Sequence, residues 1–286
     1  MQSVFKIVPA LGALSLAAAC GSGGSSNTVA FTSFSNVPAD GTVVINGEAI
    51  SSNYTQNLVS GEVTASAVSG PNPATLRSRF AGSVPQDVII EAPGANAAID
   101  LASGAVVPIA GRRIVAVSAD GRTVYISEDV APAYEYQTYG TWLTQAGTGA
   151  GAVGAGSFGA QTPVSSLPGS ASYSGSGLGF ARDAAGQGFY TDFDVAATTD
   201  FSTITVTSSN TFAENVTTEV ISSVPTLDFT GSGPVTGNRF SATIASTDTS
   251  GTASGTFYGP NAEEFGGTFD TTGPGGIVHF GAFGGQ

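Results

Sequence analysis

Short runs of alternating apolar and polar residues, separated by turn residues, recur along this chain. Within residues 29–133 they predict brief strands such as Asp87–Ile90, which is rich in β-branched residues. Asp120-Gly121 lies between two alternating runs and predicts a β-hairpin over 113–127. A short helical segment is expected within 70–85. We therefore expect residues 29–133 to form a small β-rich region.

The pattern changes after residue 133. Residues 134–142 predict an aromatic strand, and the glycine-rich segment 147–159 predicts a loop with a strand at its end. Further strand candidates follow at regular intervals: Ala171–Phe180, Gly188–Val195, Thr203–Thr207, Leu227–Gly231, Arg239–Ala245, Thr252–Tyr258, Phe265–Asp270 and Ile277–Phe283. Strands of this number can close on themselves. We predict an all-β protein in which residues 134–286 form an antiparallel barrel of about eight strands.

The alternation within these strands indicates whether the outer face of the barrel meets water or lipid. In Phe240–Ile244 one face is apolar and the other is polar, and outward positions are mostly Ser, Thr and Asp. A barrel that spans the outer membrane is the rival, but it needs apolar residues on its outer face. The pattern therefore favours a barrel whose outer face meets water.

The first residues predict export and a membrane anchor. Residues 1–19 contain one lysine, an apolar run and the small residues Ala17-Ala18-Ala19, which is the layout of a secretory signal. Cys20 follows directly, and the Gly/Ser-rich residues behind it make 20–28 a flexible tether. This arrangement resembles a bacterial lipobox, which implies that Cys20 carries lipid. The alternative is an ordinary signal peptide with an incidental cysteine.

Composition narrows the classes of partner. The formal net charge is −13, and loss of Lys6 with the signal would make it −14. Nucleic-acid binding needs clustered Lys and Arg to neutralise phosphates, so we expect no nucleic acid partner. Cys20 is the single cysteine, so the chain can form no internal disulfide. Stability must come from the sheet core.

One segment near the C-terminus carries a specific resemblance. It contains these residues at fixed spacing: Gly255, Phe257, Tyr258, Gly259, Pro260, Ala262, Glu264, Gly266, Gly267 and Phe269. The segment resembles the hallmark of the β-barrel domain of transferrin-binding protein B and related surface lipoproteins, including factor H-binding protein relatives. The resemblance implies a barrel over 134–286 preceded by a handle-like region over 29–133. It also implies a surface lipoprotein that binds a ligand.

The same motif has a physical interpretation without any family. Phe257 is expected to point inward while Tyr258 faces outward, and Gly259-Pro260 ends the strand because proline cannot donate to a ladder. Glu264 can accept hydrogen bonds from nearby backbone amides. Gly266-Gly267 permits close strand approach or a bulge, and Phe269 then fills the interior. We interpret the motif as a folding device and not as a catalytic site.

Catalytic and metal-binding patterns are absent from the sequence. The single histidine, His279, lies in a predicted strand, where we expect a half-exposed structural role. One histidine and one lipid-bearing cysteine cannot assemble a zinc site of the usual ligands. Asp192 and Asp194 lie on one face of a strand and are explained as outer-face charges. We expect no enzyme activity, no metal and no cofactor.

Three functions remain open. The leading hypothesis is a non-enzymatic lipoprotein anchored in the outer membrane through its N-terminal lipid, displayed on the cell surface or facing the periplasm. Its barrel and handle loops would bind a host or environmental protein or an iron-bearing ligand. A lipocalin-like carrier is the second, with a cavity lined by Phe189, Phe193, Phe240, Phe257 and Phe269; a structural envelope lipoprotein is the third.

Overall fold

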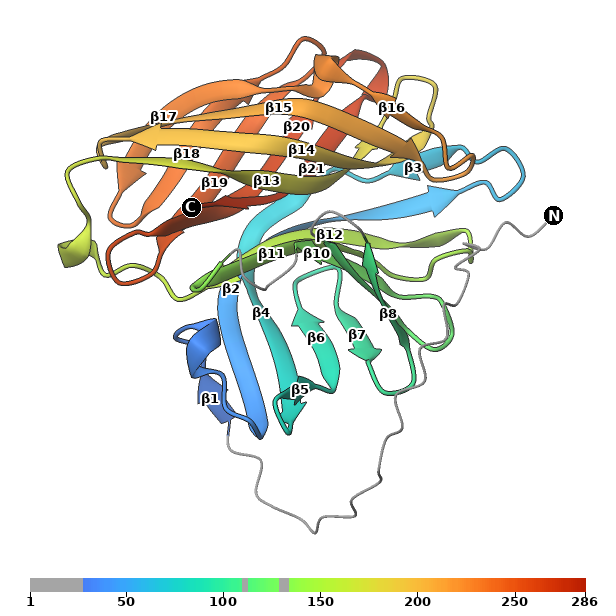
Figure 1. Ribbon diagram of the computed structural model, residues 1–286. Helices are drawn as coiled ribbons and strands as arrows, with labels where there is room; N and C mark the ends of the chain where they lie inside the picture. The colour runs from blue at the N-terminus through green and yellow to red at the C-terminus, as the bar shows by residue number, and fades with distance from the viewer. Residues whose placement is uncertain (1–27, 110–112, 129–133) are drawn as a thin grey trace.

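Two β-sheets, one curled and one closed into a barrel, make up the part of the chain that the structure describes. The computed structural model describes residues 28–109, 113–128 and 134–286 (Figure 1). The predicted signal, Cys20 and all but the last residue of the predicted tether lie outside them. Four short 3-10 helices join strands: η1 (Phe34–Asn36), η2 (Val164–Ser166), η3 (Pro225–Leu227) and η4 (Pro274–Gly276). The prediction of an all-β protein is confirmed.

The first sheet contains twelve strands and is mainly antiparallel. They are β1 (Thr28–Ala30), β2 (Gly41–Gln56), β3 (Val63–Ala65), β4 (Ser69–Ala81), β5 (Val84–Pro85), β6 (Asp87–Glu91), β7 (Ala97–Asp100), β8 (Ala105–Ile109), β9 (Arg113–Val117), β10 (Val124–Glu128), β11 (Gln137–Leu143) and β12 (Ala150–Gly159). Their order is β7-β6-β4-β2-β12-β11-β10-β9-β8, with β1, β3 and β5 beside this path. We call this the handle-like sheet.

A buried core fills the concave side of the handle-like sheet. Trp142 is fully buried there with Phe158 and Ile90, and its indole N–H donates to the Ala95 carbonyl oxygen at 2.6 Å. A buried indole needs such a partner because an unpaired donor inside a protein is costly. The curl of the sheet therefore encloses its own hydrophobic core.

The second sheet is the barrel. Its eight wall strands are β13 (Ala171–Arg182), β14 (Gly188–Thr199), β15 (Thr203–Asn215), β17 (Thr230–Thr236), β18 (Arg239–Ala245), β19 (Ser250–Tyr258), β20 (Glu264–Thr272) and β21 (Val278–Gly285). Pairing of β14 with β15 closes the ring, and β16 (Ile221–Ser223) adds to β15 outside it. Each wall strand overlaps one of the eight candidates found after residue 170, although Leu227–Gly231 shares only its last two residues with β17. The predicted eight-stranded antiparallel barrel is confirmed.

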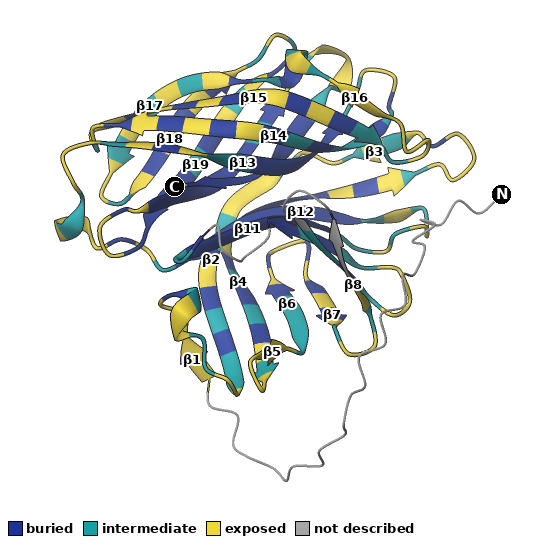
Figure 2. Cartoon of the chain, in the orientation of Figure 1, coloured by how far each residue is buried: buried dark blue, intermediate teal, exposed yellow. Residues whose placement is uncertain are grey.

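Burial alternates on the solvent side of the barrel and is continuous on the other side. Along β18 and most of β15 exposed and buried residues alternate, as expected for a wall with water outside and core inside. In β20 and β21 almost every residue is buried (Figure 2). Those strands lie against β11 and β12 of the handle-like sheet, so both of their faces are covered. We call this contact the seam.

The barrel starts later in the chain than predicted. Strands β11 and β12 pair with β10 and β2, so residues 137–159 belong to the handle-like sheet and the barrel wall begins at Ala171. Their aromatic and glycine-rich sequence suits the seam, where one strand must be buried on both faces. The change in composition near residue 134 marks the start of the seam strands and not the start of the barrel.

Two local predictions were wrong, and one was confirmed. The segment 147–159 was predicted as a loop with a strand at its end, but strand β12 takes up nearly all of it, from 150 to 159. A Cβ at Gly154 would lie 2.3 Å from the Trp142 ring. Glycine there makes room for the indole. The helix expected within 70–85 is absent, because this segment is mostly β4. The hairpin around Asp120-Gly121 is present as β9 and β10, which pair antiparallel.

Candidate functional site

The motif residues lie in β19, in β20 and in the turn between them. Phe257 is fully buried in the barrel core, and Phe269 is 1% exposed in the same core. Tyr258 points the other way, toward the handle-like sheet, where its hydroxyl lies 3.0 Å from the Ser157 hydroxyl. The predicted opposite directions of Phe257 and Tyr258 are confirmed, but Tyr258 is buried in the seam and not in contact with water.

Glu264 joins the barrel to the handle-like sheet. Its carboxylate accepts hydrogen bonds from the backbone N–H of Glu135 at 2.6 Å and of Tyr136 at 3.1 Å. Burial raises the pKa of this carboxyl to about 7, while those backbone donors act in the opposite direction. The expectation that Glu264 accepts bonds from backbone amides is confirmed. The donors come from the segment that leads into β11.

Close backbone approach explains the paired glycines of the motif. A Cβ on Gly266 would lie 2.5 Å from the Gln137 side-chain oxygen and 2.7 Å from the Ser157 hydroxyl oxygen. Gln137 in turn donates from its side-chain nitrogen to the Phe265 carbonyl oxygen at 3.0 Å. Larger residues at position 266 would push the two sheets apart. The motif therefore builds the seam.

Further bonds cross the seam at other points. Tyr134 donates to the Gly284 carbonyl oxygen at 2.9 Å, and the Tyr139 and Ser176 hydroxyls lie 2.7 Å apart. At the seam's edge Arg239 of β18 forms an ion pair with Glu48 of β2. Apolar side chains from both sheets pack between these polar contacts. The barrel and the handle-like sheet therefore present their turns in a fixed relation.

The barrel interior is filled with side chains. Seven phenylalanines of its core are at most 4% exposed: Phe193, Phe229, Phe240, Phe257, Phe265, Phe269 and Phe283. Neighbouring rings lie in contact; the Phe229 and Phe269 centroids are 4.9 Å apart, and those of Phe193 and Phe269 are 5.4 Å apart. Phe189 does not join them but lies beside a pocket outside the barrel. Because these side chains fill the interior, the structure does not support the hypothesis of a lipocalin-like carrier with its cavity inside the barrel.

His279 occupies this filled interior. It is fully buried, not half-exposed as predicted, with its Nε2 3.0 Å from the Thr191 hydroxyl oxygen. The Phe269 and Phe193 rings lie against the imidazole. Burial lowers the pKa of His279 to about 3, so the ring is neutral at physiological pH.

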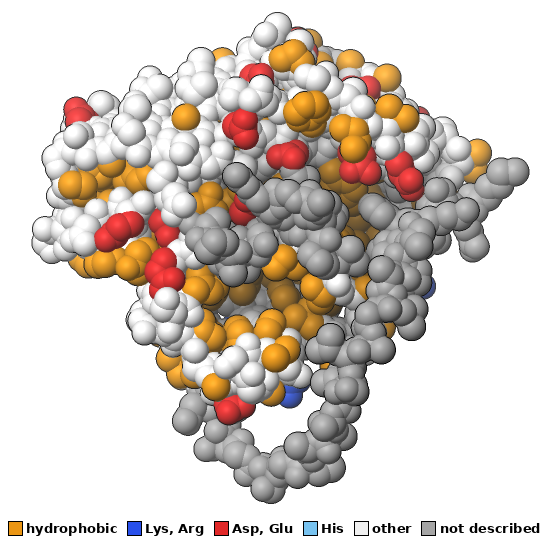
Figure 3. All heavy atoms as spheres, viewed as in Figure 1, with side chains coloured by type: hydrophobic (Ala, Val, Ile, Leu, Met, Phe, Trp, Pro, Cys, Tyr) orange, Lys and Arg blue, Asp and Glu red, His pale blue; other side chains and the backbone are white. Residues whose placement is uncertain are grey.

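Acidic and apolar side chains share the outer surface. Asp194 is exposed and accepts a hydrogen bond from the Asn210 side-chain amide, as expected for an outer-face charge. The described residues hold no group of three or more His, Cys, Asp or Glu suited to a metal ion. The search for a membrane-crossing helix, run on the same residues, found none of sufficient length and apolarity. In Figure 3 acidic side chains alternate with apolar ones near β16.

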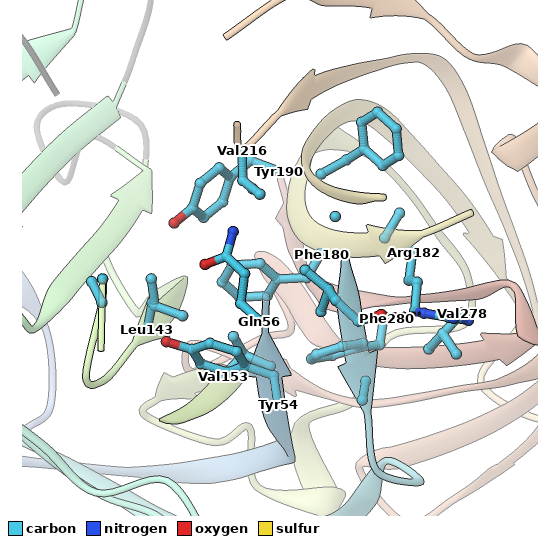
Figure 4. A pocket seen from close by; sticks show the side chains of 17 residues that line it. Tyr54, Gln56, Leu143, Val153, Phe180, Arg182, Tyr190, Val216, Val278 and Phe280 are labelled. Atoms are coloured by element: carbon cyan, nitrogen blue, oxygen red, sulfur yellow. Dashed lines mark hydrogen bonds between the residues drawn. The ribbon is translucent and has the colours of Figure 1, made fainter. Parts of the chain in front are cut away.

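A pocket of about 100 Å³ opens at the end of the seam near β3 and β16. Its walls come from both sheets: Tyr54 and Gln56 from β2, Leu143 and Val153 from β11 and β12, and Phe180, Tyr190 and Phe280 from the barrel (Figure 4). Most of this lining is aromatic or aliphatic. Sequence reasoning missed the pocket, because its residues lie on seven strands and the turns between them, which no local pattern brings together.

Comparison with known proteins identifies the barrel. Residues 166–286 match the family model described as the C-lobe and N-lobe β-barrels of Tf-binding protein B. These residues contain all eight wall strands and the motif. The barrel of this chain therefore belongs to the transferrin-binding protein B-like β-barrel family.

Structural comparison gives matches of the same name at low identity. Transferrin-binding protein B of Haemophilus parasuis Hp5 is 12% identical, with 88% of this chain and 76% of that chain covered and a TM-score of 0.42. The protein of Actinobacillus pleuropneumoniae H49 is 13% identical, with 84% and 98% covered and a TM-score of 0.43. That of serogroup B Neisseria meningitidis is 13% identical, with 87% and 77% covered and a TM-score of 0.37. The search of curated proteins found no match.

Proposed function

We propose that this protein is an outer-membrane-anchored surface lipoprotein that binds a protein or an iron-bearing ligand through the turns of its barrel and handle-like sheet. The observation that carries the proposal is the family match of the barrel, whose model is named for a protein that binds transferrin. It acts by contact, with no chemical step. The lipid on Cys20 would anchor the protein in the membrane.

The N-terminal sequence supports the anchor. Cys20 follows an apolar signal that ends in three alanines, and a Gly/Ser-rich tether separates it from β1. Two acyl chains hold a protein on a membrane far more firmly than one, because each buried methylene contributes about 0.8 kcal/mol. A lipid-bearing Cys20 would therefore keep the folded part close to the membrane while the tether lets it turn.

The rigid scaffold supports recognition by contact. Preorganised loops lose little conformational entropy on binding, so a packed barrel fixed to a second sheet is a suitable platform. Exposed apolar side chains lie on turns or short edge strands of both parts, with Val84 57% exposed on the handle-like sheet and Val164 60% exposed at one barrel end. Such side chains can serve as anchors in an interface.

The anchor is tested by palmitate labelling of cells that express the wild-type protein or Cys20→Ser. The wild type is expected to incorporate label and to fractionate with membranes. The Cys20→Ser variant is expected to lose both properties. Equal labelling of the two proteins would contradict lipid attachment at Cys20.

Binding is tested by interferometry of the immobilised protein against purified iron proteins, transferrin and haemoglobin first. A double variant, Val84→Asp with Val164→Asp, should weaken the interaction about tenfold, since buried interface anchors each contribute more than about 1 kcal/mol. Thr205→Asp on the exposed side wall of the barrel is the matched control and should leave affinity unchanged. An equal loss in the control, or no saturable binding to any protein ligand, would contradict recognition through turns.

A further inference from the structure

The pocket at the end of the seam has properties that the proposed function does not use. Its mouth is formed by turns of both sheets that touch one another. The Val63 backbone N–H donates to the Gly186 carbonyl oxygen, and a Cβ on Gly61 would lie 2.5 Å from the Thr217 hydroxyl oxygen. The β2–β3 turn, the β13–β14 turn and the β15–β16 turn therefore meet around one opening.

One polar group inside the pocket is free to bind a ligand. Gln56 lines the wall between the Tyr54, Phe180 and Tyr190 rings (Figure 4), and among the described residues no protein group bonds its side-chain amide. Tyr54, by contrast, donates from its hydroxyl to the Thr144 and Gln145 carbonyl oxygens at 3.0 and 3.2 Å. The Gln56 oxygen is thus an acceptor within an otherwise apolar wall, which is how ligand pockets fix orientation.

Acidic residues outnumber basic ones on the segments that form the opening. Glu62, Asp183, Glu214 and Glu219 lie on these segments, and Arg182 is the one charged residue of the pocket lining itself. Two backbone carbonyl oxygens already hold the Arg182 guanidinium, Val63 at 2.6 Å from Nε and Gly276 at 2.7 Å from Nη1. Burial is the main reason that the pKa of Tyr190 is raised, and the charge of Glu214 adds a smaller contribution. The local excess of carboxylates favours a cation.

Exposed apolar side chains continue the lining outward. Leu58 and Val59 on the β2–β3 turn are 61% and 97% exposed, and Val220 and Ile221 beside β15 are 61% and 65% exposed. Apolar side chains this exposed on adjoining turns form a patch of the kind that marks binding sites. The pocket and this rim together offer an apolar floor and an acceptor, and the adjoining turns carry an excess of negative charge.

We propose that this seam pocket binds a small organic cation with an apolar body, such as an alkyl- or arylammonium ion. An apolar cavity of about 150 Å³ encloses benzene; this pocket of about 100 Å³ is smaller but has an open mouth, so it would enclose an isobutyl group or take a phenyl ring that extends into the mouth. The apolar body lies against Phe180, Leu143 and Phe280. Its ammonium group donates to the Gln56 oxygen and is attracted by the carboxylates of the adjoining turns.

The same chemistry could be presented by a free amine or by a partner's lysine beside an apolar residue. Saturation-transfer NMR and calorimetry on the purified full chain separate the two, with benzylammonium as the free cation and benzoate as the matched anion. Benzylammonium is expected to bind saturably, at least tenfold more tightly than benzoate. A peptide with Lys next to Phe that competes for the site would indicate the partner-borne source.

Variants then locate the site. Ala65→Phe places a ring over the pocket from β3 and should abolish benzylammonium binding, with Ala146→Phe as a second variant should the first not fold. Ala245→Phe, on an exposed position of β18, is the matched control and should bind as the wild type does. Gln56→Leu should weaken binding, and Glu214→Gln should weaken it by a factor of about two to five, as for a partly exposed ion pair.

Each outcome of these experiments either supports the proposal or overturns it. Loss of binding in Ala65→Phe with retention in Ala245→Phe supports the proposal. Absence of saturable benzylammonium binding overturns it, and so does benzoate binding of equal strength. Binding that survives both filling variants places the ligand elsewhere and also overturns it. None of these results depends on a membrane anchor or on a protein ligand, so the proposed function can fail separately.

Discussion

Replacement of Glu264 by glutamine should change how the stability of this protein depends on pH. Burial raises the pKa of the native carboxyl to about 7 from an ordinary value of 4.5. The native state therefore binds more protons than the unfolded state between these values. The stability that this group contributes is fully present below pH 4.5 and is lost as pH rises through 7.

The magnitude follows from the two pKa values. A shift of one unit corresponds to about 1.4 kcal/mol, so the loss between pH 4.5 and pH 8 is about 3 kcal/mol, of which about 1 kcal/mol falls above pH 6.5. His279 acts in the opposite direction between pH 3 and pH 6.5, because burial lowers its pKa to about 3 from 6.5. Above pH 6.5 only the last part of the His279 effect remains, about 0.4 kcal/mol in the opposite direction, and it is common to wild type and Glu264→Gln, so the difference between these two proteins isolates Glu264.

The assay is urea denaturation of the wild type, Glu264→Gln and Glu263→Gln at pH 6.5, 7.0, 7.5 and 8.0. Relative to Glu264→Gln, wild type and Glu263→Gln should each lose about 1 kcal/mol across this range, because Glu263 is exposed and makes no bond across the seam. Glu264→Gln should show no such loss. Parallel slopes for wild type and Glu264→Gln, or a wild type that gains stability toward pH 8, would refute the reasoning.

Three further changes test the packing. His279→Gln should remove the part of acid sensitivity that appears as pH falls from 6.5 toward 3, measured as the urea midpoint at pH 4 and pH 6.5. Gly154→Ala should cost about 1–3 kcal/mol because its Cβ meets the indole in the handle-like core, while Gly169→Ala, with open space around it, should cost little. Phe257→Ala should cost about 3–5 kcal/mol by leaving a cavity in the barrel, and a stability equal to that of the half-exposed Phe212→Ala would show that the interior is not packed.

Much of the barrel could be predicted because its strands carry a local signal. The alternation of Phe240–Ile244 shows which face is buried, and Gly259-Pro260 shows where β19 ends. A strand shows this alternation only when one of its faces is exposed to solvent, as on the solvent side of the barrel. The motif from Gly255 to Phe269 indicated the family to which the barrel is similar.

The seam could not be predicted from the sequence. Strands β11 and β12 are buried on both faces, so residues 150–159 show no alternation and read as a loop. Glycine lowers strand propensity when it is considered alone, yet Gly154 is required because Trp142 lies across it. His279 was misjudged for a related reason, since its position inside the barrel depends on strands far from it in the chain.

Lipid-anchored display at the cell surface, as proposed, is tested most directly by protease shaving of intact cells. The wild-type protein should be degraded by added protease while the outer membrane is intact, and Cys20→Ser should be absent from the surface fraction. A wild-type protein that resists protease until the outer membrane is permeabilised, with a periplasmic marker degraded at the same point, would contradict surface display.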